Sequence, residues 1–246
     1  MGTLSGKTAL VTGAEGSIGG AIARHLAALG AHVVVNYLAD LPLAEKTVAA
    51  ITAAGGSAIA LQADVSSESQ LDAMFAEIDT RCGRLDFLVN NAGTGFSATV
   101  DQITNQMIDT TFAVNVKGAI YCTQRAIQRM KPGSRIINIS SSTTVYALPY
   151  LSVYTASKAV LKVFSEVWAK ELAERGINVN SVMPGPTSPG MLDASPPELK
   201  AAMAAASPYR RLGTPDDIGP VVGFLCSPES AWISGQHLLV NGAAAA

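Results

Sequence analysis

The residue pair with the clearest chemical potential is Tyr154 and Lys158, in the segment YTASK. Side chains at positions i and i+4 of a helix lie on the same face and can interact. An ammonium group beside a phenol favours the phenolate and lowers its pKa from about 10. The pair therefore suits general acid–base catalysis at an alcohol or carbonyl oxygen. Taken alone, a Tyr-Lys pair at this spacing is more often a pair of side chains on the surface of a helix. The neighbouring segments therefore decide whether this pair is functional.

Three consecutive serines precede this pair and end an apolar segment, residues 135–139. Such a short apolar run predicts a buried strand. Ligands of open α/β sheets bind at the carboxyl ends of the strands. We therefore expect the hydroxyl groups of Ser140, Ser141 and Ser142 near that edge, with Tyr154 on the helix that follows. This placement favours a functional Tyr-Lys pair over a surface pair.

A glycine-containing turn, TGAEGSIG at residues 12–19, joins a predicted strand at 8–11 to a predicted helix at 18–29. Glycines let the backbone turn sharply and approach a pyrophosphate. The N–H groups and the dipole at a helix N-terminus attract phosphate. The spacing departs from GxGxxG, so a plain strand–helix turn is the alternative when the motif is taken alone. Its context predicts a dinucleotide site.

The end of the second predicted strand, Asn36-Tyr37, bears on the choice of cofactor. An acid at this point would accept a hydrogen bond from the ribose 2′-OH of NAD and repel a 2′-phosphate. Its absence favours NADP(H). However, no Arg or Lys stands in the turn or beside Asn36, and Glu15 would repel a phosphate. The preference for NADP(H) is therefore slight, and NAD(H) is possible.

Strand-like and helix-like segments alternate along the chain, which indicates βαβ units and a parallel sheet. We predict an α/β fold in one domain, 1–246: a doubly wound sheet of about seven strands flanked by helices. The proline-rich segment 186–212 is expected to be a substrate-loop excursion with one short helix, PELKAAMAAA, and the terminal NGAAAA a frayed tail. The predicted strands are 8–11, 33–35, 57–63, 85–89, 135–139, 178–182 and 238–240, and the predicted helices are 18–29, 43–54, 66–81, 104–130 and 152–174.

Composition excludes several classes of protein. The chain has 246 residues, a net charge of −2 and 48% hydrophobic residues, which excludes general disorder and gives no reason for a nucleic-acid or anionic-membrane partner. Three separated cysteines and three scattered histidines indicate neither a disulfide framework nor a metal site. No apolar stretch is long enough to span a membrane, and MGTLSGK lacks a secretion signal, so we expect a cytoplasmic protein. Only 15% of residues are charged, which suggests surfaces hidden in an oligomer.

In its motifs the sequence resembles the short-chain dehydrogenase/reductase family over essentially the whole chain. The resemblance implies a one-domain Rossmann fold and reversible hydride transfer between NAD(P)(H) and a ketone or secondary alcohol. It also implies a homotetramer or homodimer built on the helices at 104–130 and 152–174 and on the last strand. The shared motifs are, in order, TGAEGSIG, Asp64-Val65, Asn90-Asn91-Ala92-Gly93, Asn115, Ser141, Tyr154, Lys158 and Pro184-Gly185.

The resemblance also implies roles for individual residues. Tyr154 would be the proton donor and acceptor, Lys158 would lower its pKa and bind the nicotinamide ribose, and Ser141 would hydrogen-bond the carbonyl. Asn115 would hold a water linking Lys158 to solvent, or would simply mark a helix kink. No metal is implied. The implied cofactor-binding residues are Gly13, Glu15, Ser17, Ile18, Gly19, Asn36, Asp64, Val65, Asn91, Ala92, Gly93, Tyr154, Lys158, Pro184, Gly185 and Thr187.

Some positions depart from the family pattern. Ser17 replaces the usual middle glycine, and Gly16 stands where NADP-preferring members often carry Arg. Pro189 stands where many members have Thr, so Thr187 or Ser188 would take over the contact with the nicotinamide carboxamide. These departures bear on the choice of cofactor and leave the predicted chemistry intact.

The segments expected around the substrate are mostly apolar, which favours an uncharged keto or hydroxy compound, although core packing explains them equally well. One alternative function is a 3-oxoacyl-carrier-protein reductase, for which Arg125, Arg129 and Lys131 are candidate docking residues. Another is a nucleotide-binding sensor without turnover, and a third is a same-fold epimerase or dehydratase. The substrate segments are Thr94 with Phe96, 145–151, and 186–203.

Overall fold

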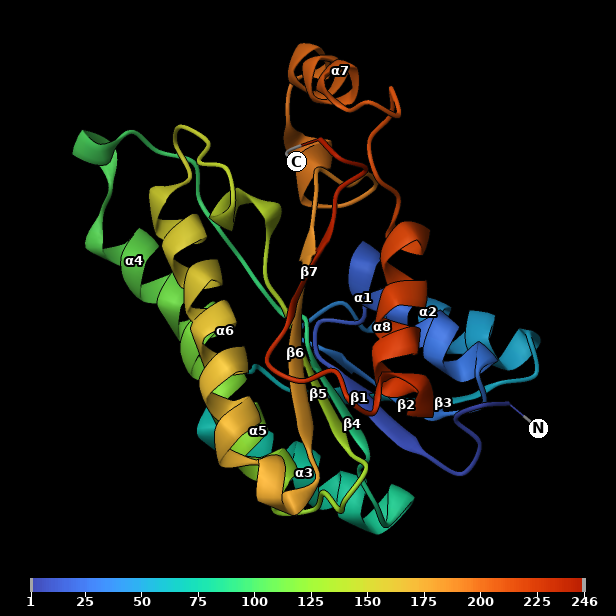
Figure 1. The fold of residues 1–246 in the computed structure, drawn as a ribbon. Helices are drawn as coiled ribbons and strands as arrows, with labels where there is room; N and C mark the ends of the chain where they lie inside the picture. Colours follow the sequence, from blue (N-terminus) through green and yellow to red (C-terminus); the bar gives the residue numbers. More distant parts are fainter. Residues whose placement is uncertain (1, 245–246) are drawn as a thin grey trace.

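A single parallel sheet organises the computed structural model, which describes residues 2–244 (Figure 1). In that range seven strands lie in the order β3-β2-β1-β4-β5-β6-β7. The predicted α/β fold with a parallel sheet is therefore confirmed. The strands are β1 (Thr8–Val11), β2 (His32–Tyr37), β3 (Ser57–Gln62), β4 (Phe87–Asn90), β5 (Arg135–Ile139), β6 (Asn178–Pro184) and β7 (His237–Val240).

The sheet is wound in two directions from its centre. The chain first builds β1, β2 and β3 outward, then returns to place β4 on the other side of β1, with Val11 beside Val89. The strand order therefore reverses between β1 and β4. In open α/β sheets, ligands bind at such a switch point, outside the carboxyl ends of the strands.

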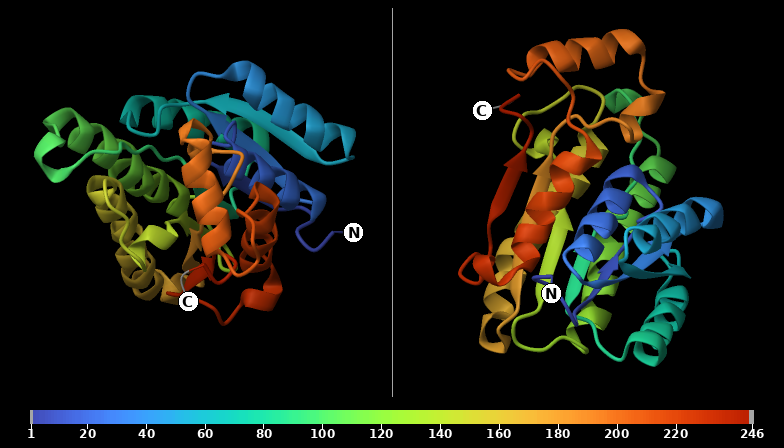
Figure 2. Two further views of the ribbon diagram at one scale, coloured as in Figure 1. Left: turned by 90° about the horizontal axis from the view of Figure 1, so that it is seen from above. Right: turned by 90° about the vertical axis from the view of Figure 1, so that its right-hand side faces the viewer.

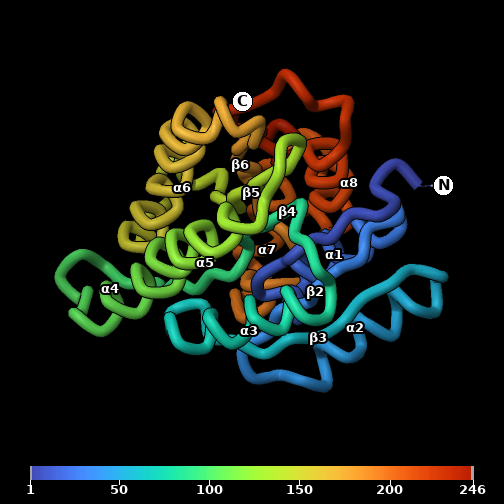
Figure 3. The backbone as a smooth tube through the Cα atoms, turned by 90° about the horizontal axis from the view of Figure 1, so that it is seen from below, coloured from blue at the N-terminus to red at the C-terminus, as the bar shows by residue number. Residues whose placement is uncertain are grey.

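Helices cover both faces of the sheet, as Figures 1 and 3 show. Each strand sends alternate side chains to opposite faces, so the apolar strands supply two cores. Val11, Val33 and Phe87 belong to one core, and Leu10 and Leu88 to the other. One face carries α1 (Ser17–Ala28), α2 (Leu41–Ala53) and α8 (Pro215–Cys226), and the other carries α3 (Glu68–Cys82), α4 (Asn105–Phe112), α5 (Gly118–Ile127) and α6 (Ser152–Glu171).

The helix predicted near 104–130 is interrupted. A π-helical segment, Ala113–Lys117, separates α4 from α5. Single π turns within α-helices often occur at functional sites. The prediction of one continuous helix is wrong because the side chain at the centre of this segment, Asn115, bonds to other parts of the chain.

Helix α8 was not predicted from the sequence. Thr214 and Asp217 form a capping box and Pro215 opens the helix, all of which are start signals. Two glycines and Pro220 obscured the helical pattern. A Cβ at Gly223 would lie 2.6 Å from Cδ2 of His25, so the missing side chain lets α8 pack closely on α1.

The segment 186–212 leaves the sheet at its carboxyl edge and carries α7 (Pro197–Ala206), which stands apart from the two helical layers in Figure 2. Main-chain bonds close its base: Gly213 N donates to Pro186 O at 2.9 Å and Ser188 N to Gly213 O at 3.0 Å. The predicted short helix is thus confirmed. Residues 245 and 246 of the predicted tail lie outside the described residues, and 242–244 form a turn. In the range 2–244 no helix combines the length and apolar character that crossing a membrane requires.

Candidate active site

Two hydrogen bonds fasten the first turns of α6 to the end of β5. The Lys158 ammonium donates to the Ile139 carbonyl at 2.8 Å, and the Ser140 hydroxyl donates to the Lys158 carbonyl at 2.8 Å. The Lys158 Nζ atom lies 6.0 Å from the centre of the Tyr154 ring. The predicted meeting of the Tyr-Lys pair with the serine-ended strand therefore exists in the structure.

Burial dominates the proton affinities of this pair. It raises the pKa of Tyr154, and a hydrogen bond with Ser141 acts in the opposite direction. It lowers the pKa of Lys158 to about 8. The expectation that Lys158 brings the pKa of the phenol below its ordinary value is wrong for this arrangement. Loss of hydration disfavours the phenolate, and the ammonium donates to the Ile139 carbonyl.

Ser141 is the residue at which β5 passes into a short 3₁₀ turn, Ser142–Thr144. Its Oγ accepts hydrogen bonds from the Thr143 N–H at 3.2 Å and from the Thr143 hydroxyl at 3.0 Å. Ser142 turns elsewhere, since its hydroxyl lies 2.9 Å from that of Tyr146. Of the three serines, Ser141 is the one that affects the pKa of the phenol.

Asn115 connects the π-helical segment to its neighbours. Its Oδ1 accepts from Thr94 N at 2.8 Å, and its Nδ2 donates to Thr94 O at 2.8 Å and to Ser157 Oγ at 2.9 Å. Ser157 in turn donates to the Tyr154 carbonyl at 2.7 Å. These contacts use the whole amide to brace the α6 turn that carries Tyr154. The water-holding role of Asn115 stays a prediction.

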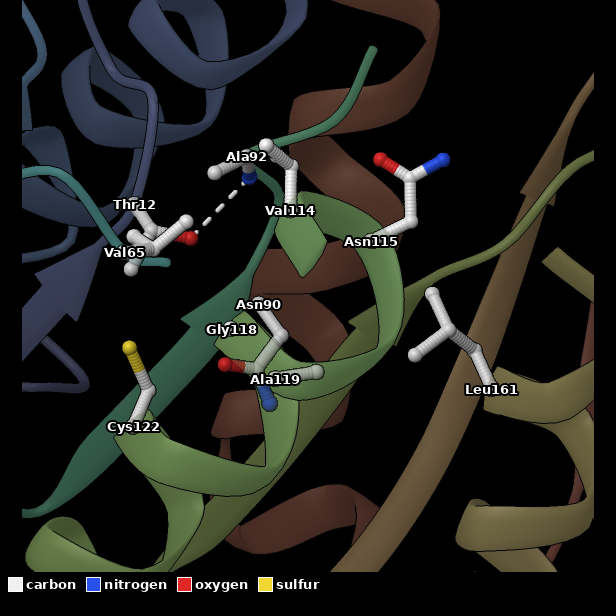
Figure 4. Close-up of a pocket in the computed structure, with 10 residues that line it drawn as sticks. All are labelled: Thr12, Val65, Asn90, Ala92, Val114, Asn115, Gly118, Ala119, Cys122 and Leu161. Atoms are coloured by element: carbon white, nitrogen blue, oxygen red, sulfur yellow. Dashed lines mark hydrogen bonds between the residues drawn. The ribbon is translucent and has the colours of Figure 1, made fainter. Parts of the chain in front are cut away.

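The glycine turn is tied to the end of β4. The Thr12 hydroxyl oxygen accepts from the N–H groups of Asn91 and Ala92, each at 3.0 Å; Figure 4 shows the Ala92 bond. The Asn91 amide donates to Thr12 O at 2.8 Å and to Gly13 O at 3.1 Å. A Cβ at Gly19 would lie 2.4 Å from Gly13 O, so only glycine fits.

A small cavity lies beside this turn (Figure 4). Its volume, about 10 Å³, is about that needed for one water molecule. Within residues 2–244, the buried Asn90 Oδ1 at its wall has no hydrogen-bond partner. The cavity is lined by Thr12, Val65, Asn90, Ala92, Val114, Asn115, Gly118, Ala119, Cys122 and Leu161.

Two polar side chains join the glycine turn to the end of β2. Asn36 is 1% exposed, and its Oδ1 accepts from Gly13 N at 3.2 Å. Its Nδ2 donates to Ala63 O at 3.1 Å, so this amide serves the backbone. Glu15 Oε1 accepts from Leu38 N at 3.0 Å. The second oxygen, Oε2, is buried and has no partner in the part of the chain that the structure describes.

The remaining predicted cofactor residues lie along the same edge of the sheet. Ser17 and Ile18 begin α1, so their N–H groups are at the helix N-terminus. A Cβ at Gly93 would lie 3.0 Å from Lys158 Nζ, which brings the segment after β4 against the lysine. Asp64 and Val65 follow β3, and Pro184 ends β6 with Gly185 and Thr187 just beyond. Among the residues described, no group of His, Cys, Asp or Glu could hold a metal ion.

Sequence reasoning missed two contributors to the site, Ser157 and Thr143. Ser157 lies inside the YTASK motif, where its position one residue before the lysine was the available signal. Thr143 follows the three serines directly. Its importance depends on a turn, Ser142–Thr144, that an apolar pattern does not reveal.

Comparison with known proteins identifies the family. Residues 13–243 match a family model described as enoyl-(acyl carrier protein) reductase. An uncharacterized oxidoreductase of Methylorubrum extorquens is 43% identical over 98% of this chain and 99% of its own length. A short-chain dehydrogenase from Burkholderia cenocepacia, solved in complex with NADP, is 36% identical with a TM-score of 0.92, and the match covers 99% of this chain and 100% of that one. The chain belongs to the short-chain dehydrogenase/reductase family.

A solved ketoreductase also has a similar structure. The angucycline C-6 ketoreductase LanV, with bound NADP, has a TM-score of 0.93 and 36% sequence identity, and the match covers 98% of this chain and 96% of that one. The family resemblance and the enzyme class expected from the motifs are therefore confirmed: the chain is an oxidoreductase of this family.

Proposed function

We propose that the chain reduces a ketone to a secondary alcohol, or catalyses the reverse reaction, with NAD(P)(H) as the hydride carrier. The supporting observation is the meeting of Ser141, Tyr154 and Lys158 at the carboxyl edge of the sheet, beside the glycine turn. The tightly packed turn that Gly13 and Gly19 allow and the N-terminus of α1 fit a dinucleotide. When bound, the nicotinamide supplies or accepts the hydride.

The protein side of the reaction is proton transfer at the substrate oxygen. Ser141 and Tyr154 hydrogen-bond the carbonyl oxygen, and Tyr154 gives its proton to that oxygen as the negative charge develops. Burial raises the pKa of Tyr154, which keeps the phenol protonated at neutral pH. The pKa of Lys158, about 8, leaves its ammonium mostly charged there. The resting site is therefore prepared to act as an acid, as ketone reduction requires.

The cofactor proposal favours NADP(H) slightly and includes NAD(H). Relatives have been solved with NADP, and no acid stands at the end of β2. The preference for NADP(H) is only slight because the Glu15 carboxylate, which would repel a 2′-phosphate, lies between the glycine turn and Leu38. Besides the catalytic Tyr154 and Lys158, the proposed binding residues are Gly13, Glu15, Ser17, Ile18, Gly19, Asn36, Asp64, Val65, Asn91, Ala92, Gly93, Pro184, Gly185 and Thr187.

An uncharged substrate with apolar flanks is the proposed class. Phe96, Val145 and Met191 expose large apolar side chains on segments that border the site, and Met191 is 62% exposed. Gly95 lies directly against the Tyr154 ring, where a Cβ would be 2.6 Å from Cδ2. The segment that carries Phe96 therefore passes next to the phenol.

A carrier-bound acyl substrate has less support. Arg125 pairs with Asp72 and Glu68, and Arg129 pairs with Asp79. These guanidinium groups are already neutralised within the chain and offer little free charge to an acidic carrier.

We also propose one NAD(P)-binding domain over 1–246, a homotetramer or homodimer, and a cytoplasmic location.

The experiment is a titration with NADP⁺ and NAD⁺, followed by NADPH and NADH oxidation with a panel of ketones. The panel includes an angucycline ketone, a 3-oxoacyl thioester and, because of the matching family model, an enoyl thioester. Binding with turnover of a ketone supports the proposal. Binding without turnover of any compound favours the sensor, and absence of binding contradicts both.

A further inference from the structure

Thr143 holds the hydroxyl group of Ser141 from two sides. Both the N–H and the hydroxyl of Thr143 donate to Ser141 Oγ, at 3.2 and 3.0 Å. Thr143 is 8% exposed and Ser141 is 6% exposed, so water has little access to compete for these bonds. The contact lies within the 3₁₀ turn that follows β5.

The number of hydrogen bonds restricts what Ser141 can do. A serine hydroxyl has one proton to donate and two lone pairs that accept. Thr143 occupies both lone pairs, so Ser141 is left with its donor function alone. The Ser141 hydroxyl lies beside the phenol of Tyr154 and acts to lower its pKa. Because Ser141 cannot accept, the phenol cannot give its own proton to Ser141.

We infer that Thr143 is a positioning residue that leaves the Ser141 hydroxyl able to act only as a hydrogen-bond donor. This inference rests on the proposed function of Ser141 and Tyr154. With both lone pairs of Ser141 occupied, its proton is left for the carbonyl oxygen of a bound ketone. The Tyr154 proton then stays available for the same oxygen. Without Thr143, Ser141 has an open lone pair and can accept the phenol proton in an unproductive bond.

The alternative is that Thr143 only stabilises the turn, and a variant of the neighbouring Thr144 distinguishes between the two roles. The Thr144 hydroxyl donates to the main-chain carbonyl of Ser141 at 2.8 Å, so it supports the same turn without touching Ser141 Oγ. Thr144→Val is therefore a matched control. It removes a hydroxyl from the same turn and keeps the hydrogen bonds to the Ser141 side chain.

The test compares Thr143→Val, Thr143→Ser and Thr144→Val with the unchanged chain. For ketone reduction, Thr143→Val lowers kcat about three- to tenfold, the range expected for one neutral hydrogen bond. KM and the Kd for NADP⁺ stay unchanged. Thr143→Ser restores kcat, and Thr144→Val retains it. A kcat unchanged in Thr143→Val, or an equal loss in Thr144→Val, overturns the inference.

A second measurement works without turnover. The lone pair that Thr143→Val opens on Ser141 lets the neutral phenol donate to it, so the titration of Tyr154 moves to higher pH in this variant and returns in Thr143→Ser. Lys158 is the other titratable group beside the phenol, and it is unaltered in all variants. Ultraviolet difference titration against Tyr154→Phe isolates the signal. An unchanged titration overturns the inference, whereas failure of the chain to reduce any ketone contradicts the proposed function instead.

Discussion

Asn36 Oδ1 accepts a hydrogen bond from the Gly13 main-chain N–H at 3.2 Å, so the end of β2 holds the glycine turn directly. The same amide bonds the Ala63 carbonyl after β3. One buried side chain thus connects three consecutive crossover segments at the carboxyl edge. Asn36, which the sequence connected with the choice of cofactor, in the structure holds main-chain groups of the site in place.

Asn36→Ala tests this brace. Removing the amide leaves the N–H of Gly13 and the carbonyl of Ala63 without partners, which costs about 1–3 kcal/mol for a buried polar group. We expect a lower free energy of unfolding in urea and weaker NADP⁺ binding. Thr52→Val, on the exposed side of α2, is the control and should change stability by less than about 0.5 kcal/mol. Equal NADP⁺ affinity in Asn36→Ala would contradict the bracing role.

Tyr154→Phe tests the acid–base assignment. Loss of the phenolic proton should lower kcat by about 10²–10⁴, the usual contribution of a general acid. The Kd for NADP⁺ should change little, because the ring remains and Lys158 keeps its bond to Ile139 O. Tyr121→Phe on α5 serves as the control and should keep full activity. Turnover preserved in Tyr154→Phe would refute the mechanism.

Glu15→Gln tests the choice between cofactors. The amide oxygen can still accept from Leu38 N, while the NH₂ group replaces the unpartnered Oε2 by a donor. A donor suits a 2′-phosphate, whereas a carboxylate repels it. The ratio of the Kd for NADP⁺ to the Kd for NAD⁺ should fall about tenfold, since hydrogen bonds to charged groups are strong. Glu45→Gln on α2 should leave the ratio as it is, and an unchanged ratio in Glu15→Gln would falsify the role of the carboxylate.

Asp217→Asn tests the start of α8 as a function of pH. The Arg211 guanidinium holds the pKa of Asp217 well below its usual range, with further bonds from Thr214. A carboxyl whose pKa is lowered on folding stabilises the folded state above its unfolded pKa, about 3.9, and loses that effect as the pH falls through the folded value. The melting temperature of the variant should therefore lie below that of the unchanged chain at pH 7, and this difference should shrink below about pH 4. Asp101→Asn provides the comparison; a difference constant with pH would argue against the ion pair.

Much of the fold could be predicted because local patterns and tertiary structure agree. The predicted bounds of β1 and β5 match the observed ones, since their apolar runs end at glycines or serines and lie inside a sheet that is buried on both faces. Helix α7 agrees likewise with the segment PELKAAMAAA.

The structure differs from the prediction where contacts between segments far apart in the sequence determine the local structure. Helix α8 needs glycines for its fit against α1, and the same glycines hide it from a propensity argument. The π-helical segment depends on the bonds of Asn115 to Thr94 and Ser157. The direction of the Tyr154 pKa depends on burial, which no spacing of residues reports.

The closed base of the segment 186–212 has a consequence for the diversification of this enzyme. A main-chain hydrogen bond joins Pro186, where the chain leaves the sheet edge, to Gly213, where it returns. The residues between them therefore form an insert whose two ends are held together. Tyr154, Lys158 and the glycine turn all lie outside that insert. Exchanging residues 190–212 for the matching stretch of a relative would therefore replace the proposed substrate segment that carries Met191 while leaving Tyr154, Lys158 and the glycine turn in place, which makes this segment a natural unit for recombination.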